Sequence, residues 1–167
     1  MLYFDTITTE ALSLLKLIQQ NSLTKKLRLV GGTALALQYG HRKSIDLDFF
    51  GKYDATYEEL SAILRDFGKT EVLKNSPSIK VFVCQGIKVD FVNYPYTWID
   101  DPVQTNDLIL ASEKDIGAMK LSAISGRGSK KDFYDLYFLL KIFSLKELLG
   151  FYEAKYHLSG LKKYGLF

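Results

Sequence analysis

The chain has 167 residues, of which 47% are hydrophobic and 25% charged, as in an ordinary soluble domain with enough residues to bury a core. Its 22 basic and 19 acidic residues give a net charge of +3, which permits nucleotide or nucleic-acid partners without requiring them. The single cysteine, Cys84, excludes an internal disulfide and a cysteine-based zinc site. No basic segment precedes the first apolar residues, and no apolar run reaches the ~18 residues of a membrane helix. We therefore expect a cytoplasmic protein without membrane contact.

Hydrophobic periodicity divides the first part of the chain into helices and strands. It predicts helices over residues 7–20, 33–40 and 56–67, and strands over 27–30, 44–50, 70–74, 78–84 and 87–94. Gly86 marks a tight hairpin between the last two strands, and Gly31 with Gly32 separates the first strand from its helix. This pattern indicates a β-sheet flanked by helices.

The remainder of the sequence is helical in character. A capping-box pattern at its start and the later apolar periodicity predict helices over 112–125, 131–143 and 144–157. The second of these helices is rich in large apolar side chains, and we expect that stripe to be core: Phe133, Tyr134, Tyr137, Phe138 and Leu140. The predicted fold is α+β, with a sheet domain over residues 1–104 and a helical region over residues 105–167 packed on it.

Two aspartates, Asp46 and Asp48, lie one residue apart in the strand predicted over 44–50. Side chains alternate along a strand, so both carboxylates face the same way, and their mutual repulsion favours a neutralising cation. A third acid, Asp90, interrupts the apolar strand over 87–94 in the same manner. If these strands are neighbours, three carboxylates converge and could hold the divalent cations that assist a phosphoryl displacement. The alternative is a half-buried strand whose polar face is solvated.

The two glycines, Gly31 and Gly32, add a second feature of phosphate chemistry. Backbone without side chains can approach a phosphate closely, and the free N–H groups at the start of a helix attract anions. A glycine pair alone is equally compatible with an ordinary turn. The P-loop pattern GxxxxGK[ST] is absent from the sequence, which argues against a phosphotransferase of that type.

Several motifs, in order along the chain, carry a resemblance to a known family: GGTALAL, RxSxDLDFF, the apolar-flanked Asp90 and SEKDIGAMKLSAISGRGSKKDFYDLYFLL. The spacing GG-x13-DxD, followed by an acid 42 residues later, resembles the polymerase β-like nucleotidyltransferase superfamily. Taken together, the motifs resemble the AbiEii/AbiGii toxins, nucleotidyltransferase-like proteins of bacterial abortive-infection and toxin–antitoxin systems. The resemblance spans roughly residues 28 to 143 and implies a nucleotidyltransferase-type mixed sheet flanked by helices.

The resemblance implies metal-dependent transfer of a nucleoside monophosphate from a nucleoside triphosphate to an acceptor hydroxyl. It assigns Mg²⁺ or Mn²⁺ to Asp46, Asp48 and Asp90, and catalysis to these acids together with Lys120 and Asp132. The nucleotide-binding residues that it implies are Gly31, Gly32, Thr33, Arg42, Ser44, Arg127 and Lys131. It further implies RNA as acceptor, such as the 3′ end of a tRNA, and a cognate antitoxin as partner. A protein or a small molecule is the alternative acceptor.

Some of these positions also have simpler interpretations. Lys120 interrupts an apolar helix stripe, and this position is better explained if Lys120 binds the triphosphate. The alternative is that the lysine extends from the apolar side to the surface. Lys131 and Asp135 have the spacing of an ordinary helical ion pair, and Arg127 could contact a phosphate or be solvated. For the domain as a whole, the alternative is a non-catalytic module that binds a nucleotide or RNA on the same fold.

Overall fold

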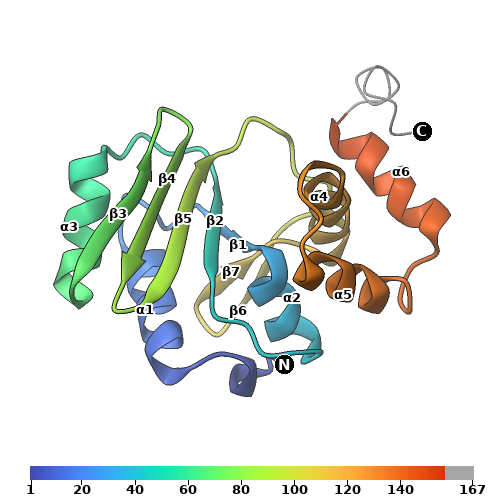
Figure 1. The fold of residues 1–167 in the computed structure, drawn as a ribbon, viewed down its shortest axis with the longest axis horizontal. Helices are drawn as coiled ribbons and strands as arrows, with labels where there is room; N and C mark the ends of the chain where they lie inside the picture. The colour runs from blue at the N-terminus through green and yellow to red at the C-terminus, as the bar shows by residue number, and fades with distance from the viewer. Residues whose placement is uncertain (157–167) are drawn as a thin grey trace. The chain divides into compact units, whose positions relative to one another are not determined.

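A computed structural model describes residues 1–156 of the chain (Figure 1). The chain forms two compact units, one of residues 1–95 and 102–110, the other of residues 96–101 and those from 111 onward. The first contains the β-sheet and is called the sheet unit below, and the second is called the helical unit. In the described part of the chain, no helix is both long enough and apolar enough to cross a membrane.

A mixed sheet organises the sheet unit, with the strand order β3-β4-β5-β2-β1-β7-β6 among the described residues. The strands are β1 (Arg28–Val30), β2 (Leu47–Gly51), β3 (Thr70–Asn75), β4 (Ile79–Cys84), β5 (Ile87–Asn93), β6 (Val103–Thr105) and β7 (Leu108–Leu110). β2 pairs with β5 and β1 pairs with β7 in parallel, whereas the other neighbours are antiparallel. Every predicted strand is present, but the one predicted over 44–50 begins at Leu47, so Asp46 precedes it.

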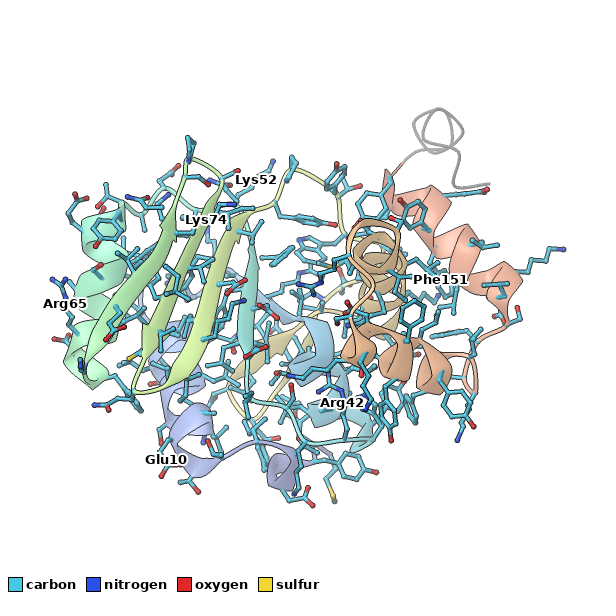
Figure 2. All side chains as sticks on the ribbon, viewed as in Figure 1. Glu10, Arg42, Lys52, Arg65, Lys74 and Phe151 are labelled. Carbon is cyan, nitrogen blue, oxygen red and sulfur yellow. The ribbon has the colours of Figure 1, made fainter. Side chains whose placement is uncertain are left out.

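Helices pack around this sheet. They are the short η1 (Phe4–Thr6), α1 (Thr9–Gln20), α2 (Gly31–Tyr39) and α3 (Tyr57–Phe67). The side-chain oxygens of Thr8 and Thr56 accept backbone N–H groups at the starts of α1 and α3, which satisfies donors that have no partner within the helix. α1 and α3 contact each other, and α3 contacts β3 and β4. Their outer polar side chains, such as Glu10 and Arg65, are exposed (Figure 2).

The two central strands of the sheet separate a buried face from a half-buried polar face. Leu47, Phe49, Val89 and Phe91 are each 0% exposed. The rings of Phe49 and Phe91 stack with their centroids 5.6 Å apart. Asp48 and Asp90 occupy the alternate, half-buried positions of the same two strands. The period of two therefore directs the apolar side chains into the core and both acids to the other face.

Two strands were not predicted from the sequence. β6 and β7 form a hairpin whose turn residues Asn106 and Asp107 have φ of +53° and +62°, as in a two-residue type I′ turn. Each strand has three residues, too few for a periodic pattern to be recognised. β7 pairs with β1, so the sheet continues to Leu110, and the domain boundary expected after residue 104 falls inside β6.

Three helices make up the described part of the helical unit: α4 (Glu113–Gly126), α5 (Lys130–Leu139) and α6 (Leu145–Tyr156). The side chains of Ser112 and Ser129 cap α4 and α5. α4 contacts both of the other helices. Near the start of α4, the carboxylate of Asp115 lies 2.7 Å from Nζ of Lys155 on α6, and both side chains are fully buried. This ion pair links the first and last helices of the unit.

α5 buries the opposite face from the one predicted. Its buried residues are Asp132, Asp135 and Leu139. The exposed fractions of its large apolar side chains are 53% for Phe133, 51% for Tyr134, 62% for Tyr137 and 43% for Leu140. The prediction that this stripe is core is therefore wrong for these four residues. The two acids are inside because they pair with the buried ammonium of Lys120, which needs opposite charges close by.

Candidate active site

The three acids predicted as metal ligands lie in the sheet unit, two of them side by side. Asp48 on β2 is the direct parallel partner of Asp90 on β5, so their side chains share a face. On its other side Asp48 pairs with Val30, the last residue of β1. Asp46 precedes β2 by one residue and is half-buried, as is Asp48. The sheet register therefore brings Asp48 and Asp90 together, whereas the convergence of Asp46 with them stays a prediction.

The start of α2 lies directly beside Asp48. Gly31 follows Val30 without an intervening loop, has φ of +73°, and is the first residue of the helix. A Cβ atom at Gly31 would lie 2.9 Å from Oδ2 of Asp48, so the close approach as well as the backbone conformation requires glycine. Val30 offers no side-chain cap to α2. The first turn of α2 thus lies next to a carboxylate, and binding of a phosphate by its N–H groups stays a prediction.

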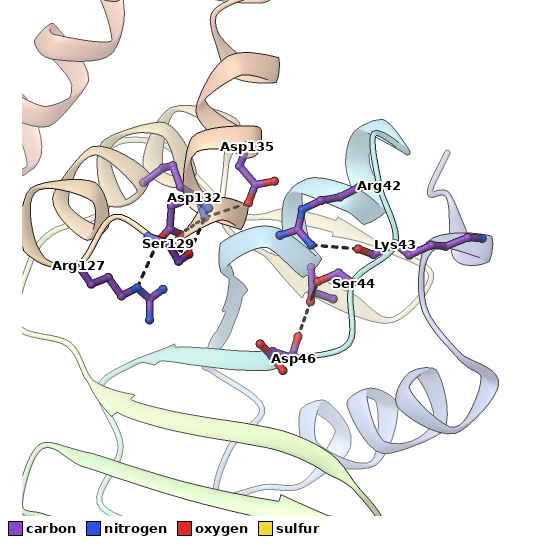
Figure 3. A network of polar contacts seen from close by, with 10 residues as sticks. Arg42, Lys43, Ser44, Asp46, Arg127, Ser129, Asp132 and Asp135 are labelled. Atoms are coloured by element: carbon purple, nitrogen blue, oxygen red, sulfur yellow. Dashed lines mark hydrogen bonds and ion pairs between the residues drawn. The ribbon is translucent and has the colours of Figure 1, made fainter.

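Thr33 and Ser44, both predicted to bind the triphosphate, are buried and bonded to each other. Their hydroxyl oxygens are 2.7 Å apart, and Thr33 Oγ1 also donates to the backbone carbonyl of Asp46. Figure 3 shows Ser44 and Asp46 in this network. The contacts fix the segment before β2 to the first turn of α2. In this arrangement the two hydroxyls position Asp46.

Arg42 lies in the loop between α2 and β2, beside an anchored stretch of backbone. Its Nη1 donates to the carbonyl of Lys43 at 3.0 Å (Figure 3). Lys43 Nζ in turn donates to the carbonyl of Asp5. The N–H of Ser44 donates to the carbonyl of Thr6 at 2.9 Å. The loop that carries the predicted phosphate ligand Arg42 is thereby tied to η1.

A lysine that the sequence analysis did not select lies on the acidic face. Nζ of Lys88 is 3.0 Å from Oδ1 and 3.2 Å from Oδ2 of Asp90. Burial alone would lower the pKa of Lys88, but the hydrogen bond to Asp90 and the charges of all three aspartates raise it above its ordinary value. Lys88 is therefore charged at neutral pH and partly compensates the acids.

These acids fit a hard divalent cation bound together with a nucleotide. Mg²⁺ typically takes only one or two protein carboxylates and completes its shell with water and phosphate oxygens. The adjacent Asp48 and Asp90 match that number, and Oδ1 of Asp90 is shielded from solvent, with the ammonium of Lys88 3.0 Å away. Among residues 1–156, no three or more His, Cys, Asp or Glu side chains are already grouped to hold a metal. Participation of Asp46 as a third ligand stays a prediction.

Lys120 and Asp132, the catalytic residues predicted in the helical unit, belong to a buried ion-pair network. Nζ of Lys120 lies 3.0 Å from Oδ1 of Asp132 and 3.0 Å from Oδ2 of Asp135. All three side chains are at least nine-tenths buried. The lysine does not extend to the surface, and Asp135 is not the surface partner expected for Lys131. Lys120 instead holds two carboxylates of α5 against α4.

Asp132 is the centre of this network (Figure 3). Its Oδ2 accepts hydrogen bonds from the N–H of Ser129 at 3.1 Å and from its hydroxyl at 2.8 Å, which completes the capping box of α5. Nε of Arg127 lies 3.3 Å from the same oxygen. Burial alone would raise the pKa of Asp132, but the bonds from Lys120 and Ser129 and the charges of Lys120 and Arg127 lower it to about 2. Asp132 is therefore ionised throughout the physiological range.

The two basic side chains of the helical unit that were predicted to bind the nucleotide are accessible to a ligand. The side chain of Arg127 is 72% exposed despite its contact with Asp132. Lys131, in the first turn of α5, is also exposed. Both were predicted to bind the nucleotide, and their accessibility is compatible with a phosphate contact.

Comparison with known proteins assigns the chain to a family. The family model described as "Nucleotidyl transferase AbiEii toxin, Type IV TA system" matches residues 13–160, which include the glycine pair and the three aspartates predicted as metal ligands. The chain belongs to the AbiEii family. The family and the fold class predicted from the sequence are thus confirmed.

A curated relative of this AbiEii chain is similar to it over most of its length. A protein of Aquifex aeolicus (strain VF5), described as uncharacterized, is 41% identical over 134 residues, which cover 77% of this chain and 65% of that protein. The chain thus spans 65% of the length of this curated relative.

Solved structures share the fold at low sequence identity. The crystal structure of JHP933 from Helicobacter pylori has a TM-score of 0.56 at 20% identity and covers 85% of this chain and 70% of its own. The solution structure of the antibiotic-resistance factor ANT(2'')-Ia has a TM-score of 0.63 at 14% identity and covers 85% of this chain and 89% of its own. At these identities the likeness concerns the fold alone.

In this AbiEii chain the sequence analysis missed Lys88 and assigned Asp135 to Lys131 rather than to Lys120, although each residue left a signal. Lys88 lies two positions before Asp90 in a strand, so period-two alternation places it on the same face. Asp135 lies three positions after Asp132 in a helix, so both acids share one side. In each case the signal was the spacing from a residue already selected.

Proposed function

We propose that this protein is a Mg²⁺-dependent nucleotidyltransferase, which moves a nucleoside monophosphate from a nucleoside triphosphate to an acceptor hydroxyl. The observation that carries the proposal is the pairing of Asp48 with Asp90 directly beside the start of α2, where Val30 supplies no side-chain cap. A helix start favours phosphate, whereas two adjacent carboxylates repel it. The two features are compatible in one site when a divalent cation lies between the carboxylates and the phosphates.

The residues of the sheet unit have distinct roles in this reaction. The N–H groups of Gly31 and Gly32 bind the triphosphate, and Asp48 and Asp90, with Asp46 as the third ligand, hold Mg²⁺, which neutralises charge on the phosphates when it is bound. Asp90 accepts the proton of the acceptor hydroxyl. The hydroxyl oxygen forms a bond to the α-phosphorus while the bond from that phosphorus to the β-phosphate oxygen breaks, and pyrophosphate leaves. Thr33 and Ser44 keep Asp46 in position.

The helical unit supplies phosphate contacts in the same proposal. Arg127 and Lys131 are exposed basic groups suited to the triphosphate. Lys120 and Asp132 are positioning residues, since their buried ion pair fixes the start of α5, and Asp132 directly contacts Arg127. Arg42 contributes from the sheet unit.

The acceptor in this proposal is RNA, such as the 3′ end of a tRNA, and the protein acts in the cytoplasm as the toxin of a type IV toxin–antitoxin pair. The family description supports the toxin assignment and a cognate antitoxin as partner. A protein or small-molecule hydroxyl is the alternative acceptor, and it gives a different labelled product.

Transfer of label tests the proposal. The protein is incubated with Mg²⁺, total bacterial RNA and each α-labelled nucleoside triphosphate in turn, beside the variants Asp46→Asn and Asp48→Asn. A matched control is Asp54→Asn, an exposed acid outside the site. We expect labelled RNA from the wild type and the control, and a loss of roughly 100-fold or more in each site variant. Label on protein would identify a protein acceptor, and equal transfer by all variants would contradict the proposal.

The contact between Lys88 and Asp90 favours a second function, nucleotide or RNA binding without catalysis. A lysine at this carboxylate already provides a positive charge, which lessens the need for a metal. If the protein is only a binder, the wild type binds nucleotide in calorimetry but transfers no label. The variant Asp48→Asn then binds nearly as well as the wild type.

A further inference from the structure

We infer that the exposed side of α5 is a binding surface for single-stranded RNA. This surface, called the α5 face below, consists of Lys130, Lys131, Phe133, Tyr134, Tyr137 and Lys141. Its shape and charge point to single-stranded nucleic acid, and the choice of RNA over DNA rests on the proposed function. The inference adds a recognition surface for the acceptor that is distinct in sequence from the acids of the sheet.

The α5 face is outward because the polar side of α5 is inward. Asp132 and Asp135 turn toward Lys120, and each lies 3.0 Å from its ammonium. Residues three or four positions apart share a helix side, so burying these two acids leaves the aromatic residues on the opposite side. The capping box of Ser129 with Asp132 and the ion pair with Lys120 hold this orientation. Exposure of the rings is therefore built into the packing of the helix.

The charge of the α5 face complements a polyanion. Between residues 130 and 141 the exposed charged residues are three lysines, and both acids of this stretch are buried. The carboxylates are compensated inside the helical unit by Lys120 and Arg127, so they leave the positive charge of the surface uncancelled. Binding of a phosphate backbone to such a surface releases counterions and weakens as salt rises.

The rings of the α5 face suit unpaired bases. Tyr137 is 62% exposed, and Nζ of Lys141 lies 4.8 Å from the centre of its ring. Phe133 and Tyr134 are four and three positions earlier, so the three rings lie along one side of the helix. Alternating rings and cations are how proteins bind single strands with little sequence preference, because every base can stack. A protein partner fits less well, since lysine is depleted from protein–protein interfaces.

Binding to labelled RNA tests the inference without any transfer reaction. Fluorescence anisotropy measures the affinity of the full chain for a labelled single-stranded oligo(A) of about twelve nucleotides, without nucleoside triphosphate or metal. Tyr137→Leu removes the ring but keeps an apolar side chain, and we expect it to weaken binding by roughly five- to a hundredfold. Tyr137→Phe keeps the ring and should bind nearly as the wild type does. Oligo(dA) and a double-stranded RNA serve as competitors.

A charge-reversal pair tests the cations of the same surface. Lys130→Glu/Lys141→Glu should weaken binding and reduce its dependence on salt. The matched control is Lys25→Glu/Lys26→Glu, which makes the same change of charge at two exposed lysines of the sheet unit. Equal loss of affinity in the two pairs would mean that overall charge, not the α5 face, governs binding.

The outcomes separate this inference from the proposed function. Unchanged RNA binding by Tyr137→Leu would overturn the inference. If Tyr137→Leu instead changes the oligomeric state measured by sedimentation but not the affinity for RNA, the inference is also overturned, and the surface is a protein interface. Label transfer by a protein whose RNA binding is indifferent to Tyr137 would refute only the inference. RNA binding that depends on Tyr137 in a protein without transfer activity would refute only the proposed function.

Discussion

Replacing Lys120 with methionine is expected to destabilise the fold strongly. The substitution removes the ammonium that lies 3.0 Å from both Asp132 and Asp135, whose side chains are 2% and 0% exposed. Methionine keeps the unbranched stem, so packing changes little. Removing one partner of a buried ion pair typically costs about 3–5 kcal/mol, because a charge is left uncompensated in a medium of low polarity. Against a typical domain stability of about 5–15 kcal/mol, this is a large part of the total.

Urea unfolding at pH 7, followed by circular dichroism, measures the loss. The exposed Lys130→Met is a matched control and should change the free energy of unfolding by less than about 0.5 kcal/mol. The triple variant Lys120→Met/Asp132→Asn/Asp135→Asn removes all three charges, and we expect it to regain at least half of the lost stability. A loss below about 1 kcal/mol in Lys120→Met, or a triple variant no more stable than the single one, would refute the assignment of this network.

Three further predictions concern backbone conformation, a second ion pair and pH. Gly31→Ala should lower the free energy of unfolding by about 1–2 kcal/mol, because φ at this position is +73°. It should also abolish label transfer, because the new Cβ would displace the carboxylate of Asp48. The control Gly86→Ala, with φ of +78° and nothing near its Cβ, should lose similar stability in urea unfolding but keep its activity. Lys155→Met should lower the free energy of unfolding by about 3–5 kcal/mol, because it leaves the buried carboxylate of Asp115 without its ammonium partner. It should also speed hydrogen exchange at the N–H groups of Ile99 and Asp100, which donate to Asp115, and unchanged exchange would contradict this. The pKa of Asp132 falls from 3.8 to about 2 on folding. Its contribution of about 2 kcal/mol to the free energy of unfolding is therefore present above pH 4 and lost as the pH falls through 2. In urea unfolding, the stability of Asp132→Asn should depend less steeply on acid pH than that of the wild type.

The orientation of each acid could be predicted from the sequence because it depends on local periodicity. Alternation along each strand places Asp48 and Asp90 opposite the apolar side chains, and the hairpin at Gly86 identifies β5 as a strand. That β2 and β5 are neighbours was only a condition of the prediction, and the sheet register supplies it. The position of Gly31 beside Asp48 could be anticipated only as a glycine near a helix start. The close approach itself depends on the pairing of β1 with β2, which the sequence does not specify.

The orientation of α5 could not be predicted because it depends on another helix. Hydrophobicity alone favours burial of Phe133 and Tyr137, but the ammonium of Lys120 on α4 determines which side of α5 is inside. The buried pair of Asp115 with Lys155 likewise joins residues 40 positions apart in the sequence. Neither pairing has a local pattern, since buried charges find their partners through the tertiary fold.

The position of the label within the nucleotide tests the central claim most directly. The protein is given RNA, Mg²⁺ and a nucleoside triphosphate labelled in either the α- or the γ-phosphate, and Asp90→Asn is measured beside the wild type. The account predicts that the α-label is joined to RNA, that the γ-label leaves as pyrophosphate, and that Asp90→Asn loses the transfer. Joining of the γ-label to the acceptor, or full α-label transfer by Asp90→Asn, would contradict a nucleotidyl transfer that depends on the acidic face of the sheet.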